Sequence, residues 1–110
     1  MEKKETHKTI WLSYDLGFKG DYPGLYTWLA KYEAKECGDS LAVFKVKKNG
    51  DIIKKITKEI KENVSLNSSD RIYIIYKDDA GLVKGKFVNG RRKRAAWDDY
   101  IIKGANEEDV

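Results

Sequence analysis

The stretch from Thr9 to Gly20 constrains the fold of this chain more than any other segment. Every second residue in it is apolar, and this set comprises Ile10, Leu12, Tyr14 and Leu16. Period-two alternation is typical of a strand with two different faces. The other face carries one carboxylate, Asp15, just before a glycine loop at 17–20. We therefore predict a strand whose apolar face meets helices, with Asp15 near the strand end, where α/β proteins tend to place their chemistry.

Two later segments have the period of amphipathic helices. Asp21 or Tyr22 is the expected N-cap and Pro23 the expected start of a helix. An apolar stripe follows at i, i+3, i+4 and i+7, formed by Leu25, Trp28, Leu29 and Tyr32. Asp51 stands before a second stripe, formed by Ile52, Ile53, Ile56, Ile60 and Val64. We predict one helix from Pro23 to about residue 34 or 35, and a second from Asp51 through Val64.

The remaining segments predict strands. Residues 40–47 alternate in character, and residues 71–76 are apolar on both faces, which is typical of an interior strand. Residues 82–88 carry Lys84 and Lys86, which suit an edge strand because charge discourages unwanted pairing. Residues 34–37 form either a short strand, folded back through Gly38 and Asp39, or a plain connection.

The order strand, helix, short strand, strand, helix, strand is the ferredoxin-like βαββαβ arrangement with an extra C-terminal strand. We predict this α+β fold, with two helices on one face of a mainly antiparallel sheet. The opposite face, which carries Trp11, Ser13 and Asp15, is left open unless something covers it. A partner subunit is one candidate for that cover.

Length and composition indicate one domain. The 110 residues match a typical domain length, and we divide them into a flexible leader at 1–8, a single domain at 9–102 and an acidic tail at 103–110. The single cysteine, Cys37, excludes an intramolecular disulfide. The N-terminus lacks the apolar region of a signal peptide, and no apolar run approaches the length of a membrane span. We expect a cytoplasmic protein without membrane contact.

A basic run is the strongest electrostatic signal in the chain. The net charge is +4, and four consecutive cations, Arg91, Arg92, Lys93 and Arg94, follow a strand that carries Lys84 and Lys86. Trp97 lies three residues further on. Cations grip phosphates and an aromatic ring stacks a base, so these residues predict contact with RNA, DNA or another polyanion. Two alternatives stay open: a solvated tail whose aromatic residues pack back on the core, and contact with an acidic protein surface.

Three segments resemble a known family. They are Ser13-Tyr14-Asp15-Leu16, the strand from Asp39 to Val46, and the strand from Asp70 to Tyr76. Together they resemble the Cas-two, VapD and SinR-like group of ferredoxin-fold proteins, over roughly residues 9–77. The resemblance implies a homodimer and a nucleic-acid partner. In that group an aspartate matching Asp15 is associated with a divalent metal and phosphodiester cleavage, and some members act as nucleic-acid scaffolds.

The resemblance and the basic run lead to one expectation and one alternative. We expect a small nucleic-acid-binding protein that forms a homodimer, with metal-dependent endonuclease or ribonuclease activity as a possible addition. If it is an enzyme, Asp15 is the predicted catalytic residue and the ligand of Mg²⁺ or Mn²⁺. The alternative is a non-enzymatic interaction module, a small inhibitor or adaptor, that docks through its open sheet face or its basic tail.

Overall fold

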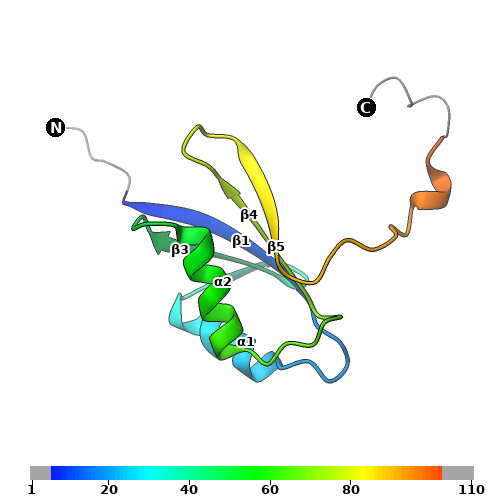
Figure 1. The fold of residues 1–110 in the computed structure, drawn as a ribbon, viewed down its shortest axis with the longest axis horizontal. Coiled ribbons are helices and arrows are strands. Elements are labelled where there is room, and N and C mark those ends of the chain that lie inside the picture. The colour runs from blue at the N-terminus through cyan, green and yellow to red at the C-terminus, as the bar shows by residue number, and fades with distance from the viewer. Residues whose placement is uncertain (1–5, 103–110) are drawn as a thin grey trace.

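The computed structural model describes residues 6–102, which form five strands, two α-helices and one 3-10 turn (Figure 1). In chain order these elements are β1 (His7–Asp15), α1 (Tyr22–Lys31), β2 (Lys35–Gly38), β3 (Leu41–Lys47), α2 (Ile52–Asn63), β4 (Arg71–Lys77), β5 (Val83–Asn89) and η1 (Asp98–Tyr100). In this described part, no helix is long and apolar enough to cross a membrane.

The five strands form one antiparallel sheet in the order β2-β3-β1-β4-β5. The predictions of an α+β protein, of two helices and of an antiparallel sheet are therefore confirmed. The short strand at β2 is real, β4 is an interior strand, and β5 lies at an edge. The arrangement is compatible with a ferredoxin-like fold. Its sheet has five strands, so the strand order differs from that of a four-stranded ferredoxin-like sheet.

The core lies between one face of the sheet and the two helices, which Figure 1 shows on the same side of the strands. Side chains of all three central strands, β3, β1 and β4, are buried there together with the helical stripes. The fully buried apolar members of this core are Ile10, Leu12, Leu25, Trp28, Ile56, Ile60, Ile72 and Ile74. Burial of apolar side chains at about 1.5–3 kcal/mol each is the main term that stabilises the fold.

Asp21 joins the two helices at their ends. Its Oδ1 accepts a hydrogen bond from the Gly24 N–H at 3.0 Å, which caps α1 as predicted, and its Oδ2 accepts one from the Ser65 N–H at 2.9 Å, just beyond α2. These two backbone donors stabilise the charged form and hold the pKa of the Asp21 carboxyl below its usual range. A β-carbon at Gly24 would lie 2.8 Å from the carbonyl oxygen of Asn63, so this approach requires glycine.

Glu59 of α2 provides a second polar link between the helices. Its Oε1 accepts hydrogen bonds from Trp28 Nε1 at 3.0 Å and from the Tyr32 hydroxyl at 2.7 Å. Burial, together with this carboxylate, raises the pKa of the Tyr32 hydroxyl to about 12. Both partners lie on the α1 stripe, so the bond fixes how the two helices pack.

Two predicted boundaries are wrong. Helix α1 ends at Lys31, not at residue 34 or 35, because Glu33 adopts a positive φ of 52° that reverses the chain into β2. Strand β1 begins at His7, where its pairing with Lys47 of β3 starts, so residues 7 and 8 belong to the sheet and not to a leader. The predicted acidic tail at 103–110 lies outside the described residues.

Candidate nucleic-acid interface

The sheet has a second face, which the helices do not cover. Directly paired residues on neighbouring strands point to the same side of a sheet, so the register assigns every strand residue to a face. Trp11 pairs with Val43 of β3 and with Ile75 of β4, while the helix-side residues Leu12 and Ile74 pair with one another. We call the side that carries Trp11, Val43 and Ile75 the open face.

An aromatic pair occupies the open face on β4 and β5. Tyr73 and Phe87 are cross-strand partners whose ring centroids lie 4.7 Å apart in an edge-to-face arrangement. The Arg71 guanidinium lies 5.7 Å from the centroid of the Phe87 ring, within cation–π range. The Tyr73 ring extends across Gly85, where a β-carbon would collide with the tyrosine hydroxyl. The glycine therefore allows the ring to lie flat along the sheet.

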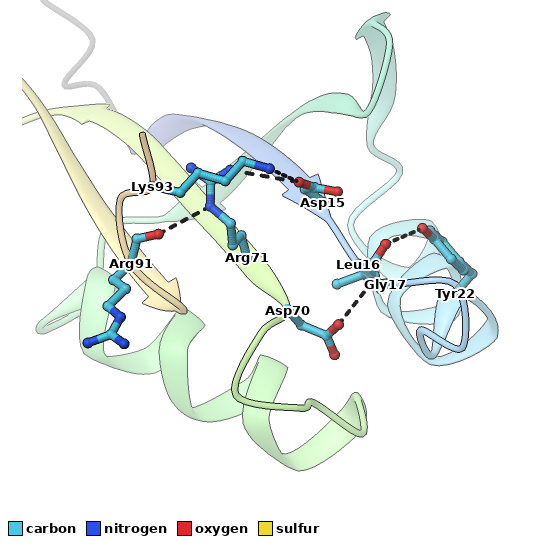
Figure 2. A network of polar contacts seen from close by, with 8 residues as sticks. All are labelled: Asp15, Leu16, Gly17, Tyr22, Asp70, Arg71, Arg91 and Lys93. Atoms are coloured by element: carbon cyan, nitrogen blue, oxygen red, sulfur yellow. Dashed lines mark hydrogen bonds and ion pairs between the residues drawn. The ribbon is translucent and has the colours of Figure 1, made fainter. Parts of the chain in front are cut away.

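The basic segment, residues 91–94, follows β5 and turns back toward β4. Gly90 makes the turn with a φ of 84°, and a β-carbon there would lie 2.6 Å from the Asp70 carbonyl oxygen. Arg71 Nε then donates a hydrogen bond to the Arg91 carbonyl oxygen at 3.2 Å (Figure 2). The side chains of Arg91, Arg92, Lys93 and Arg94 are exposed. The turn thus holds the basic segment beside the open face.

A groove lies between the basic segment and the open face. It has a volume of about 460 Å³, and its lining combines sheet residues Ser13, Arg71, Tyr73 and Phe87 with segment residues Arg92, Lys93, Arg94, Ala95, Ala96 and Trp97. Trp97 is 67% exposed, so it does not pack back on the core. The structure therefore brings Trp97 together with three of the four cations of the basic segment, and it adds an arginine, Arg71, and two aromatic rings, Tyr73 and Phe87.

Asp15 lies on the open face beside this groove, but its neighbours are cations. Its Oδ2 is 3.7 Å from Arg71 Nη1 and 3.6 Å from Lys93 Nζ (Figure 2). Within residues 6–102, no group of three or more histidine, cysteine, aspartate or glutamate side chains is placed to hold a metal ion. Two cations and one carboxylate do not fit the all-oxygen ligand set that Mg²⁺ or Mn²⁺ takes. Within one chain, Asp15 is a salt-bridge partner.

The sequence predicts that Lys84 and Lys86 act together with the basic segment, but the structure does not bring them to it. They pair with Tyr76 and Ile74, so they point to the helix side of the sheet. Lys84 Nζ also lies 3.0 Å from Asp78 Oδ2, and this carboxylate raises the pKa of Lys84. Alternation along β5 therefore turns both lysines away from the groove, and their contact with nucleic acid stays a prediction.

Local acids also engage the last cation of the segment. Arg94 Nε lies 3.4 Å from Asp98 Oδ2, and Arg94 Nη2 contacts Asp99 Oδ1. Both aspartates belong to η1, four and five residues further along the chain. Among the groove-lining cations of the segment, Lys93 and Arg94 have acidic partners, so Arg92 is the one that the described residues leave best placed to meet a phosphate.

Sequence reasoning missed Arg71, Tyr73 and Phe87 as interface residues. Strand 71–76 was interpreted as apolar on both faces, whereas only Ile72 and Ile74 are fully buried. The available signal was the alternation of those isoleucines with Arg71 and Tyr73. Alternation does not predict that Tyr73 pairs with Phe87, because a bulge between Ile72 and Tyr73 shifts the β4–β5 register.

Comparisons of the chain with protein-family models, with curated proteins and with solved structures find no match. The resemblance to the Cas-two, VapD and SinR-like group therefore stays a prediction. What the interface binds must be argued from its own chemistry.

Proposed function

We propose that the protein binds single-stranded nucleic acid on the open face of a ferredoxin-like sheet. The observation that carries the proposal is the groove, where the Tyr73–Phe87 pair lies beside Arg71 and the basic segment. The rings offer stacking surfaces for bases, and the cations offer partners for phosphates. The order of helices and strands supports the finer description of the sheet as ferredoxin-like.

The aromatic component favours single strands over duplexes. A duplex keeps its bases stacked on one another, so it presents mainly phosphates to a protein surface. Unpaired bases can be splayed out and stacked on aromatic side chains, and sheets that display such side chains are a common means of binding single-stranded RNA. Partly exposed Tyr73 and Phe87 and exposed Trp97 are of the right type for this contact.

A comparison of two polyanions tests the proposal. Binding of a fluorescent single-stranded oligonucleotide and of polyphosphate is measured by anisotropy for wild type, Phe87→Leu and Arg92→Ala. Stacking is worth about 1–3 kcal/mol per base, so Phe87→Leu is expected to weaken oligonucleotide binding about 5- to 150-fold and to leave polyphosphate binding unchanged. Arg92→Ala is expected to weaken both and to lower the slope of log K against log salt by about 0.7.

Lys58→Ala provides the matched control, because Lys58 is an exposed cation of α2 on the covered side of the sheet. It removes the same charge as Arg92→Ala and is expected to change neither affinity by more than about twofold. Equal losses in Lys58→Ala and Arg92→Ala would mean that binding follows net charge, and the proposal would be wrong. Absence of oligonucleotide binding together with capture of a protein partner would favour the interaction-module alternative.

Metal-dependent cleavage and homodimer formation stay predictions. Because the residues around Asp15 in one chain do not fit a divalent ion, cleavage requires a further carboxylate, such as Asp15 of a second copy. The expected result is Mg²⁺- or Mn²⁺-dependent cleavage by a dimer that Asp15→Asn abolishes. Cleavage that Asp15→Asn leaves intact, or a monomer that binds without cleaving, would contradict it.

A further inference from the structure

A second group of cations lies on the open face at the end opposite the groove. Lys45 pairs with Thr9 and Lys47 pairs with His7, so both lysines share the face of Trp11. Lys77 ends β4 two residues beyond Ile75 and lies on the same face. Lys45, Lys47 and Lys77 are exposed, and we call them the far patch.

A cleft opens next to the far patch because β1 and β4 separate there. The two strands pair only from Trp11 to Asp15, and the β4–β5 hairpin then diverges from the first half of β1 (Figure 1). The resulting cleft has a volume of about 360 Å³ and is lined by His7, Lys8, Thr9, Trp11, Lys48, Lys77, Asp78, Asp79 and Gly81. Its lining therefore includes a ring, Trp11, that also stands at the middle of the open face.

The acids of this cleft are already engaged by other side chains. Asp79 Oδ1 lies 3.7 Å from Lys8 Nζ, and Asp78 Oδ2 lies 3.0 Å from Lys84 Nζ. Two backbone N–H groups, those of Ala80 and Leu82, also donate to Asp78 and help to hold its pKa below the usual range. Because both carboxylates have cationic partners, the far patch adds a net positive charge to its end of the open face.

The spacing between the groove and the far patch fits a short oligonucleotide. Asp15 lies eight residue steps along β1 from His7, which is about 27 Å at the rise of a strand. At the 3.4 Å per nucleotide of a stacked strand this distance corresponds to about eight nucleotides, and to fewer in a more extended chain. Site sizes of about 4–16 nucleotides are usual for single-strand-binding domains.

We propose that the far patch is a second phosphate-binding subsite for the same strand. This inference rests on the proposed function of the groove. A single strand whose bases stack on Tyr73 and Phe87 continues along β1, passes Trp11, and places further phosphates against Lys45, Lys47 and Lys77. The protein therefore selects strands that are long enough to reach both ends of the open face.

A length series tests the subsite. Affinities of wild type and of Lys45→Ala/Lys47→Ala are measured for unlabelled oligonucleotides of about three and about ten nucleotides, by competition against a fluorescent strand. The variant is expected to bind the short strand as wild type does and the long strand more weakly. Its salt slope for the long strand is expected to fall by about 1.4, because two phosphate contacts are lost. Lys58→Ala/Lys61→Ala, on exposed positions of α2, is the charge-matched control.

The possible results separate this inference from the proposed function. Suppose that wild type binds the long strand, and that the far-patch variant either loses the same affinity for both lengths or loses none. The subsite proposal would then be wrong, while the proposed function of the groove would be unaffected. If wild type binds no strand of either length, the proposed function fails and the subsite fails with it. Urea unfolding of each variant confirms that exposed lysine substitutions leave the fold intact.

Discussion

Asp70 is the one fully buried charged residue among the described residues, and its replacement tests the architecture beneath the interface. Its Oδ1 accepts a hydrogen bond from the Gly17 N–H at 3.0 Å, and its Oδ2 accepts one from the Asn67 N–H at 2.8 Å. Its backbone carbonyl accepts a third from Asn89 Nδ2 at 2.8 Å. Asp70 therefore joins the loop after β1, the loop before β4 and the end of β5. Figure 2 shows the first of these links, the contact between Asp70 and Gly17.

Asp70→Asn keeps the shape of the side chain but replaces one acceptor with an amide NH₂. One hydrogen bond to a charged acceptor is lost, at about 1.5–3 kcal/mol, and a partly buried backbone donor, the N–H of Gly17 or of Asn67, loses its acceptor. We expect the free energy of unfolding to fall by about 2–4 kcal/mol. At about 4–8 °C per kcal/mol for a domain near this size, the midpoint of thermal unfolding falls by at least about 8 °C.

Urea unfolding followed by tryptophan fluorescence measures this loss, with an unchanged m-value as the sign that the native state is otherwise preserved. Asp39→Asn is the matched control, because Asp39 is exposed and the same chemical change there is expected to cost less than about 0.5 kcal/mol. Equal stability of the two variants, or a loss below about 1 kcal/mol in Asp70→Asn, would refute the role assigned to this carboxylate.

Three further predictions concern the packing. The hydroxyl of Tyr32 has a pKa of about 12 in the folded protein and near 10 in the unfolded chain, so the free energy of unfolding falls as pH rises from 10 to 12. Tyr32→Phe is expected to reduce that fall, as measured by urea unfolding at a series of pH values. Gly24→Ala is expected to destabilise the protein by about 1–3 kcal/mol, because its β-carbon meets Asn63 across the helix junction; an unchanged urea midpoint would contradict this. Gly85→Ala is expected to displace the Tyr73 ring while changing the free energy of unfolding by less than about 1 kcal/mol, and oligonucleotide affinity is expected to fall. Unchanged affinity would argue against Tyr73 as a stacking surface.

The fold was largely predictable because local patterns and tertiary packing agree. Alternation in β1 and the 3.6-residue stripes of α1 and α2 correspond to the buried side chains of the core. Asp21 and Asp51 cap the two helices as their positions indicated. The end of α1 was missed because a positive φ at Glu33, a residue with no intrinsic preference for it, depends on the return of the chain into β2.

The candidate site was only partly predictable, because it depends on contacts between distant segments. The basic segment and Trp97 were evident from the sequence, but Arg71 reaches them across 20 residues through the Arg91 carbonyl. The buried role of Asp70 was hidden as well, since in sequence it is one polar residue in a polar loop. That Lys45 and Lys47 lie on the face opposite the core could have been inferred, because they alternate with the apolar residues Phe44 and Val46.

The central claim is that single-stranded nucleic acid binds the open face of the sheet. Nuclear magnetic resonance shift mapping, with isotope-labelled protein and an unlabelled oligonucleotide of about ten residues, tests it most directly. We predict shifts at open-face residues of β1, β3, β4 and β5 and at residues 91–97, with the tryptophan side-chain signals of Trp11 and Trp97 among the largest. Signals of the exposed α1 and α2 surfaces are expected to stay in place. Shifts confined to the helices, or no shifts in the presence of excess strand, would contradict the claim.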